Sequence, residues 1–201
     1  MILYIFFLFV VAYLIGAIPT GVILSKLFGR GDLQRQGSKN IGATNVSRVM
    51  GKKWGILTLL GDVLKGMIAV WIGQWGLSSL PGSSGYPLAL IAFGAFLGHC
   101  FPVYLAFKGG KGVATALGIF LIISPLVVLL VIPIFLVATY LGKFVSLGSM
   151  ASAFSFPVLL VWLHYPYEIV VLSLFIALGI ILKHQENIKR IIRGEEKSWR
   201  N

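Results

Sequence analysis

A glycine-rich basic segment, FKGGKGVAT at residues 107–115, interrupts the long apolar runs of this chain. Its glycines free the backbone to curl, and the apolar residues that follow predict a helix whose first N–H groups point back at the segment. A helix N-terminus beside two lysines is an arrangement that binds phosphate, although an ordinary basic turn has the same composition. The segment is not a Walker A loop, because no glycine opens the motif at the required spacing and the Ser or Thr is missing. The candidate phosphate-binding residues are Lys108, Gly109, Gly110, Lys111 and Gly112.

A second polar segment is QGSKNIGATNVSRVMGKK, residues 36–53. Small polar side chains between glycines form anion-binding nests, and an arginine can donate two hydrogen bonds to two phosphate oxygens. An ordinary solvated loop is the alternative, but apolar Ile41, Ala43 and Val46 are interleaved with the polar residues, which indicates a segment folded onto the protein. The candidates in this segment are Ser38, Asn40, Thr44, Asn45, Ser47 and Arg48.

A third segment, KHQENIKRIIRGEE at 183–196, follows the last apolar run. His184, Asn187 and Ile191 are spaced i, i+3 and i+7, so a helix would place them on one face. His184 and Asn187 could therefore turn inward together. Taken alone, an amphipathic basic tail of this kind is most often attracted to anionic lipid.

Three ionisable residues fall inside apolar runs. Asp62 and Lys65, in LLGDVLKG, are three apart, and we interpret them chiefly as an ion pair that holds helices together. His99 follows the small-residue pattern GAFLG, in which Gly94 and Gly98 suit close helix packing. We favour a supporting role for His99, hydrogen-bonded inside the helix bundle, over a direct chemical role.

The composition explains why charges inside these runs matter. Of 201 residues, 58% are hydrophobic and 11% charged, and the mean hydropathy is +0.93, which excludes a soluble domain. The sequence predicts an all-α, polytopic integral membrane protein with one domain over 1–201. In such a protein a net charge of +11 indicates a positive cytoplasmic face and an anionic ligand, so no nucleic-acid partner is expected. Its single cysteine excludes a disulfide framework and a multi-cysteine metal site, and no metal or cofactor is expected.

Seven transmembrane helices fit the apolar runs: about 2–25, 54–78, 87–107, 113–123, 125–142, 144–163 and 167–183. The first is expected to be retained, because no basic region precedes it as in a signal peptide. Lysines and arginines gather in the loops after spans one, three, five and seven, and none falls in PGSSGYP, SP or HYPYE. The positive-inside rule then predicts an outside N-terminus and a cytoplasmic C-terminus.

The run 113–142 could also form one long helix. A single crossing would put the basic C-terminal tail outside, so we predict two crossings with a break near Ser124 and Pro125. The span 113–123 is too short for a hydrocarbon core that needs about 20 residues. Its N-terminus at Gly112 is therefore expected below the membrane surface, where non-helical backbone must line a polar cavity.

All three polar segments are predicted on the cytoplasmic face. A transporter would place its anion site near the membrane midplane, so a one-sided site favours an enzyme that takes a soluble anionic substrate and a lipid-like one. A transporter or flippase for a phosphorylated or lipid anion is the rival hypothesis, and a membrane scaffold with a basic face is the third.

Three long stretches, GSKNIGATNVSR, GHCFPVYLAFKGGKGVAT and KHQENIKRIIRGEE, resemble in order and spacing the cytoplasmic motifs of the PlsY-type glycerol-3-phosphate acyltransferases of bacteria. The resemblance spans the chain. It implies transfer of an acyl group from acyl phosphate to the 1-hydroxyl of glycerol 3-phosphate in the inner membrane, giving lysophosphatidic acid for phospholipid synthesis. The family uses neither acyl-CoA nor acyl carrier protein and lacks the His-x4-Asp motif, which is also missing from this sequence.

The resemblance also implies roles for particular residues. Carried over by position, the expected catalytic residues are Ser38, Arg48, His184 and Asn187, with Glu196 in support. Asp62, Lys65 and His99 are expected to be supporting residues on other grounds, because they lie inside the apolar runs. The glycine loop 109–112 is implied to hold acyl phosphate, with the acyl chain among the apolar spans of a monomer in membrane lipid. Lys39 departs from the family pattern, since many relatives have a small residue there. The proton acceptor stays open between His184 and a substrate phosphate oxygen, and Ser38 is expected to donate to phosphate, since no neighbouring base would activate it as a nucleophile.

Overall fold

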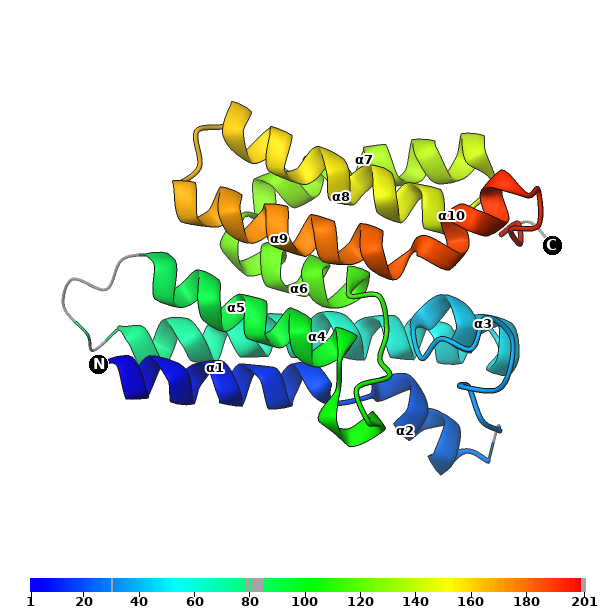
Figure 1. The fold of residues 1–201 in the computed structure, drawn as a ribbon, viewed down its shortest axis with the longest axis horizontal. Helices are drawn as coiled ribbons and strands as arrows, with labels where there is room; N and C mark the ends of the chain where they lie inside the picture. The colour runs from blue at the N-terminus through cyan, green and yellow to red at the C-terminus, as the bar shows by residue number, and fades with distance from the viewer. Residues whose placement is uncertain (30, 79, 81–84, 200–201) are drawn as a thin grey trace. The chain divides into compact units, whose positions relative to one another are not determined.

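A computed structural model of the protein describes residues 1–29, 31–78, 80 and 85–199 (Figure 1). All regular secondary structure within these residues is helical, which confirms the all-α prediction. Two of the basic residues used to orient the chain, Arg30 and Arg200, and the outer-loop residues 81–84 lie outside the described residues. The chain divides into two compact units, residues 1–122 and 123–201, which we describe separately. The single domain stays a prediction.

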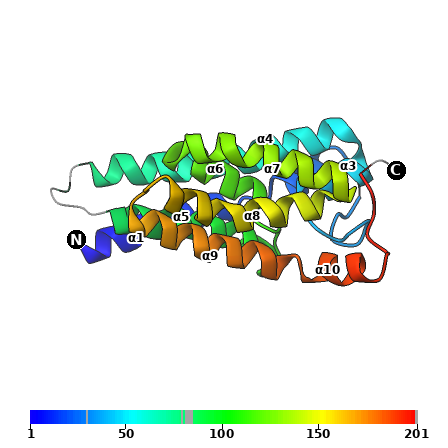
Figure 2. The same ribbon diagram turned by 90° about the horizontal axis from the view of Figure 1, so that it is seen from above.

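The first unit contains the first and second polar segments. In it α1, α4 and α5 pack against one another, and α3 packs against α4 (Figures 1 and 2). The elements are α1 (Ile2–Ala17), α2 (Thr20–Leu27), α3 (Ala43–Met50), α4 (Lys52–Leu77), α5 (Gly85–Cys100), the 3-10 turn η1 (Val103–Leu105) and α6 (Val113–Ile123), whose last residue already belongs to the second unit.

Helices α1 and α5 approach so closely that side chains at the contact must be small. A Cβ on Gly98 would collide with the carbonyl oxygen of Tyr13, and one on Gly16 would collide with the backbone of Ala95. A Cβ on Gly94 would meet Phe9 at 2.9 Å. The close packing predicted from GAFLG is therefore confirmed, and it fixes the direction in which α5 delivers the chain to the glycine-rich segment.

The first apolar run is not one helix. It was expected to continue to residue 25, but α1 ends at Ala17 and α2 begins at Thr20, with an angle of 42° between them. The cause is Pro19, which has no N–H to donate and disfavours helical geometry in the residue before it. This break leaves the Ile18 carbonyl oxygen available to a side chain from another helix.

The second unit contains α7 (Pro125–Gly142), α8 (Val145–Trp162), α9 (Tyr167–Lys183) and α10 (Gln185–Ile192). Helix α8 packs against both α7 and α9. Pro125 stands in the first turn of α7, where a proline needs no N–H partner, so the predicted break near Ser124 and Pro125 is confirmed. Helices α9 and α10 meet at 53° about His184.

Every predicted span after the first corresponds to one helix, and the first corresponds to α1 and α2 together. Among the described residues, four helices are long and apolar enough to cross a membrane, and six spans result if each bent pair counts as one. Helix α6 has the predicted bounds and only 11 residues. Exposed apolar side chains such as Leu129 and Leu141, 64% and 73% exposed, suit lipid contact. The count of seven and the orientation stay predictions.

Candidate active site

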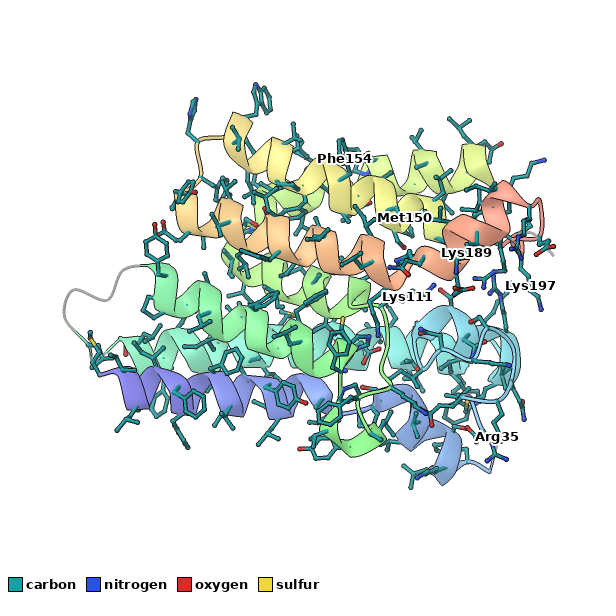
Figure 3. All side chains as sticks on the ribbon, in the orientation of Figure 1. Arg35, Lys111, Met150, Phe154, Lys189 and Lys197 are labelled. Carbon is teal, nitrogen blue, oxygen red and sulfur yellow. The ribbon has the colours of Figure 1, made fainter. Side chains whose placement is uncertain are left out.

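The glycine-rich segment begins with strained backbone. After η1 the chain passes through Ala106 and Phe107, whose φ angles of 48° and 63° lie in the left-handed region that non-glycine residues rarely adopt. Strain of this kind persists where the surrounding structure imposes it, and it is common at functional sites. The chain then reaches the basic residues, of which Lys111 is labelled in Figure 3 just before α6.

Gly110 and Gly112 have no room for a side chain because aromatic rings occupy the space. The Gly110 N–H donates to the His99 carbonyl oxygen at 3.0 Å, and a Cβ on Gly110 would fall on the His99 ring. Gly112 combines a φ of 84° with the Phe96 ring, which a Cβ would also strike. Helix α6 starts directly afterwards, since the Ala116 N–H donates to the Gly112 carbonyl oxygen at 2.8 Å. The predicted glycine loop before a helix N-terminus is therefore present.

Residues 36–53, the first of the three motifs in chain order, are partly helical, although the sequence indicated one loop. Residues 43–50 form α3, which leaves 36–42 as the loop before it. Thr44 and Arg48 are exposed and lie one turn apart on α3, while Val46 and Met50 join Leu33 in a small apolar cluster. This cluster confirms that the segment folds onto the protein, as its interleaved apolar residues indicated.

Asn45 organises the loop that precedes α3. Its side chain is 1% exposed, and its Oδ1 accepts a hydrogen bond from the Ser38 N–H at 2.7 Å. Its Nδ2 lies within 3.2 Å of three carbonyl oxygens, those of Leu33, Gln36 and Asn40. A buried amide satisfied in this way fixes the backbone around Ser38. The sequence placed Asn45 among the phosphate ligands, and the role that the structure adds is to shape the loop.

Lys39 has a backbone conformation that suits glycine better than lysine. Its φ of 56° lies in the left-handed region, where glycine is free of strain and a side chain is not. The side chain is exposed. The lysine at this position therefore costs local strain.

The structure brings the first and second motifs together within the first unit. The Gln34 side-chain amide donates to the Lys108 carbonyl oxygen at 3.3 Å. This bond ties the chain just before residues 36–53 to the residue that precedes the glycine loop. Gln34 was not among the candidates, because nothing in its type or spacing marks it as a link between loops.

In the second unit His184 is held by the backbone. It stands at the bend between α9 and α10, is 2% exposed, and its Nδ1 lies 2.8 Å from the Ile180 carbonyl oxygen. A carbonyl oxygen only accepts, so Nδ1 carries the hydrogen and the lone pair of the neutral ring is on Nε2. The sequence offered no acidic residue to orient His184, and the structure assigns that role to a backbone carbonyl.

His184 and Asn187 keep helical spacing across the bend between α9 and α10. The Ile188 N–H donates to the His184 carbonyl oxygen at 2.9 Å, so helical hydrogen bonding continues from His184 into α10. Asn187 is 6% exposed and donates through Nδ2 to Glu196 at 2.6 Å. Both residues are therefore buried.

Glu196 is the centre of a small network in the second unit. Its carboxylate accepts from Asn187, from the Arg190 Nε at 2.7 Å and from the Ser146 hydroxyl at 2.9 Å, and its side chain is 5% exposed. Burial raises the pKa of this carboxyl, but the hydrogen bonds from Asn187, Arg190 and Ser146 outweigh it and hold the pKa below its usual range. The network fixes the segment after α10 against α8.

Trp199 attaches the same segment a second time. Its backbone N–H donates to the Lys143 carbonyl oxygen at 3.1 Å, and its indole N–H donates to the Thr139 carbonyl oxygen at 3.2 Å. Lys143 has a φ of 63° in the turn between α7 and α8. The C-terminal segment therefore lies on that turn, an attachment that the sequence did not predict.

The buried ion pair predicted between Asp62 and Lys65 is confirmed. Lys65 Nζ lies 2.8 Å from Asp62 Oδ1, and both side chains are at most 5% exposed. His99 is also buried, 3% exposed, as expected for a residue inside the helix bundle. Among the described residues, no group of three or more His, Cys, Asp or Glu side chains is placed to hold a metal ion.

Comparison with known proteins identifies the family. The family model for glycerol-3-phosphate acyltransferase matches residues 6–194. This chain belongs to the glycerol-3-phosphate acyltransferase family. The relative in Syntrophotalea carbinolica is 48% identical over 94% of each chain, and the one in Desulfotalea psychrophila is 45% identical over 94% of this chain and 95% of the relative. Both carry the name glycerol-3-phosphate acyltransferase.

Solved structures agree with this assignment. A crystal structure of PlsY, an integral membrane glycerol 3-phosphate acyltransferase, in its glycerol 3-phosphate form is 39% identical, with a TM-score of 0.90 over 97% of this chain and 95% of that one. A lysophosphatidic acid form is 38% identical, with a TM-score of 0.86 over 96% and 94%. The resemblance of the three motifs to PlsY-type enzymes is thereby confirmed.

The match to the glycerol-3-phosphate acyltransferase family covers both compact units. It includes the first motif, the glycine loop, His184 and Asn187, and it ends before Glu196 and Trp199. The protein is therefore a multi-pass integral membrane member of this family.

Proposed function

We propose that this chain transfers an acyl group from an acyl phosphate to the 1-hydroxyl of glycerol 3-phosphate, releasing lysophosphatidic acid and inorganic phosphate. The observation that carries the proposal is the pair of ligand forms named for the similar PlsY structures, glycerol 3-phosphate and lysophosphatidic acid. These are the acceptor and the product of such a transfer. The hydroxyl oxygen forms the ester bond while the acyl–phosphate bond breaks, and the hydroxyl proton passes to a base.

Acyl phosphate as the donor is supported by the chemistry of the first unit. Two basic segments, joined by the bond from Gln34 to Lys108, suit a reaction in which both substrates carry phosphate. Acyl phosphate is a mixed anhydride with a good leaving group, so its acyl carbon needs little activation. The enzyme then has to align the hydroxyl with the carbonyl and stabilise the departing phosphate. The missing His-x4-Asp pattern argues against the acyl-CoA route.

The phosphate-binding roles follow from exposure and donor type. Arg48 and Thr44 stand exposed on one side of α3, where the arginine fork can bind two phosphate oxygens. Ser38 and Asn40 donate side-chain hydrogen bonds to phosphate from the loop that Asn45 organises. Lys108 and Lys111 supply charge beside the backbone N–H groups of the glycine loop and α6. The acyl phosphate binds at the glycine loop.

His184 and Asn187 take part in the transfer itself. With its hydrogen on Nδ1, the His184 ring has a basic Nε2, which suits it to accept the hydroxyl proton. A substrate phosphate oxygen is the second possible acceptor, because two phosphate groups are already bound near the reacting hydroxyl. Asn187 orients a substrate oxygen through its amide, with Glu196 holding that amide in place.

The reaction takes place at the cytoplasmic face of the bacterial inner membrane, by a monomer with no cofactor. Orientation is testable with single cysteines in a Cys100→Ser background. His164→Cys lies in the turn between α8 and α9, and Ser198→Cys lies in the C-terminal segment. A membrane-impermeant thiol reagent should label the first from outside and the second from the cytoplasm. Labelling of both from one side would contradict the proposed topology.

The activity itself is tested with purified protein in lipid. Glycerol 3-phosphate is supplied with palmitoyl phosphate or, as the matched donor, palmitoyl-CoA, and lysophosphatidic acid is measured by mass spectrometry. Product is expected from palmitoyl phosphate alone. Arg48→Ala should abolish product, and Arg48→Lys should restore little because an ammonium cannot fork onto two oxygens. Product from palmitoyl-CoA would contradict the proposal that acyl phosphate is the donor. Near-normal turnover by Arg48→Lys would contradict a bidentate contact between Arg48 and phosphate.

A further inference from the structure

A buried polar cluster in the first unit has no place in the proposed reaction. Asp62 accepts from Lys65 at 2.8 Å and from the Thr20 hydroxyl at 3.2 Å. Lys65 also donates to the Ile18 carbonyl oxygen at 2.8 Å, the carbonyl exposed by the break between α1 and α2. The cluster therefore joins α4 to the bend of the first apolar run.

His99 connects this cluster to the glycine loop. Its Nδ1 lies 3.7 Å from Asp62 Oδ1, beyond hydrogen-bond distance but close enough for the carboxylate to attract an N–H on that nitrogen or a protonated ring. Its carbonyl oxygen accepts the Gly110 N–H, and its ring occupies the space that a Cβ on Gly110 would need. The same carbonyl oxygen lies where a Cβ on Gly109 would fall. The loop thus rests on both the backbone and the ring of one residue.

Holding helices together does not require charges. A buried ion pair is weak support for stability, because well-packed apolar side chains of similar volume often do as well or better. Ionisable groups inside a membrane protein are costly, and functional sites are where they are usually found. An apolar pair could not, however, orient an imidazole by attraction.

We propose that Asp62 is a positioning residue for the glycine loop. It keeps the His99 ring in contact with Gly110, and His99 in turn fixes the position of the Gly109–Gly110 backbone. This inference rests on the proposed binding of acyl phosphate by the loop. Lys65 neutralises the buried carboxylate and anchors it to the break at Ile18, so the bend in the first apolar run is also part of the support for the loop.

The test removes both charges together, because Asp62→Asn alone would leave a buried lysine without its carboxylate and could prevent folding. The Asp62→Asn/Lys65→Met double variant is compared with Thr58→Val, a buried substitution on the same helix whose hydroxyl bonds only to the Trp54 carbonyl oxygen of its own helix. Thermal unfolding and size-exclusion chromatography in detergent show which variants are folded.

Kinetics then separate positioning from simple support. In the double variant the KM for palmitoyl phosphate and the inhibition constant of inorganic phosphate should each rise about tenfold, as expected when a binding group moves by a fraction of an ångström. The KM for glycerol 3-phosphate should stay within about twofold of the wild type. A folded double variant with wild-type constants for palmitoyl phosphate and phosphate would overturn the inference.

A double-mutant cycle tests the ring contact directly. Gly110→Ala and His99→Ala should each weaken palmitoyl phosphate binding, and the combined variant should be no weaker than the worse single one, because the added methyl then has space. Additive losses would overturn the role of the ring. Absence of product from the wild-type protein would overturn the proposed function and this inference together, whereas an active wild type with additive losses overturns the inference alone.

Discussion

The glycine loop follows α5 and the C-terminal segment follows α10, and both contain residues proposed to form or support the site, but they are held in different ways. The loop is fixed by a backbone hydrogen bond to His99 and by rings that leave no space for side chains at Gly110 and Gly112. The C-terminal segment is fixed by side chains, chiefly the Glu196 carboxylate and the Trp199 indole.

This difference predicts different sensitivities. A region fixed by close packing should be intolerant of added atoms and indifferent to removal of a surface charge. A region fixed by a carboxylate should tolerate changes of shape at its glycine and respond to charge and pH. Gly194 fits this expectation, because its φ of 72° is surrounded by open space.

The largest effect is expected at His184, the residue proposed to take part in the transfer itself. His184→Ala should lower kcat by about 10² to 10⁴, whether the ring accepts the proton or only positions a substrate. With a substrate phosphate as the base, which the proposed binding of two phosphorylated substrates favours, His184→Asn should keep substantial activity. The acidic limb of the pH–rate profile of this variant should then stay near pH 6, where a phosphate undergoes its second ionisation.

The pH–rate profiles of wild type and His184→Asn measure this. Complete loss of turnover in His184→Asn, with both substrates still bound, would identify the ring as the base. The Nε2 lone pair left by the bond from Nδ1 to Ile180 makes that outcome chemically possible.

The next largest effect compares two glycines. Gly110→Ala introduces a clash with the His99 ring without any change in φ, and about 1–3 kcal/mol of strain corresponds to a loss of roughly 5- to 150-fold in kcat/KM. Gly194→Ala introduces only left-handed strain in open space, so kcat/KM should stay within about threefold. Steady-state kinetics with expression and thermal unfolding as controls check both. Equal losses in the two variants would erase the distinction between the regions.

Much of this comparison was outside the reach of the sequence. The break at Pro125 was predictable because proline acts locally, whereas the bend at His184 has neither proline nor glycine to mark it. The contact between His99 and Gly110 depends on two left-handed residues, Ala106 and Phe107, whose types give no hint of that conformation.

The candidate site was predictable where it relied on residue type and motif spacing. Lysines, glycines and His184 stood out in the sequence for that reason. Asn45 stood out as polar, but its bonds to three carbonyl oxygens arise only once the loop is folded. Trp199 was not among the candidates, since its two acceptors lie in a turn far away in the chain.

A smaller effect is expected from Glu196→Gln, which keeps the shape of the side chain and removes its charge. Hydrogen bonds that involve a charged group contribute about 1.5–3 kcal/mol, less where the partner is partly exposed as Arg190 is, so activity should fall several-fold, by about 3- to 10-fold. Glu195→Gln is the matched control, because that neighbouring side chain is exposed. Kinetics and thermal unfolding of the pair check this. Equal behaviour of the two variants would remove Glu196 from its supporting role.

The smallest effect concerns pH and needs no loss of activity. The pKa of Glu196 is lowered in the folded protein, so its contribution to attachment is complete above the ordinary glutamate pKa of about 4.3 and is lost as the pH falls through the lowered value. A spin label at Glu195→Cys, in a Cys100→Ser background, should be ordered at pH 7 and become mobile as the solution is acidified below pH 4. With Glu196→Gln added, the label should already be mobile at neutral pH and show no step. A label at Phe107→Cys should keep its spectrum in the presence of Glu196→Gln, because packing and backbone bonds in the first unit hold the glycine loop. If the step at residue 195 persists without the Glu196 carboxylate, another group attaches the segment, and the contrast between a packed loop and a charge-held tail fails.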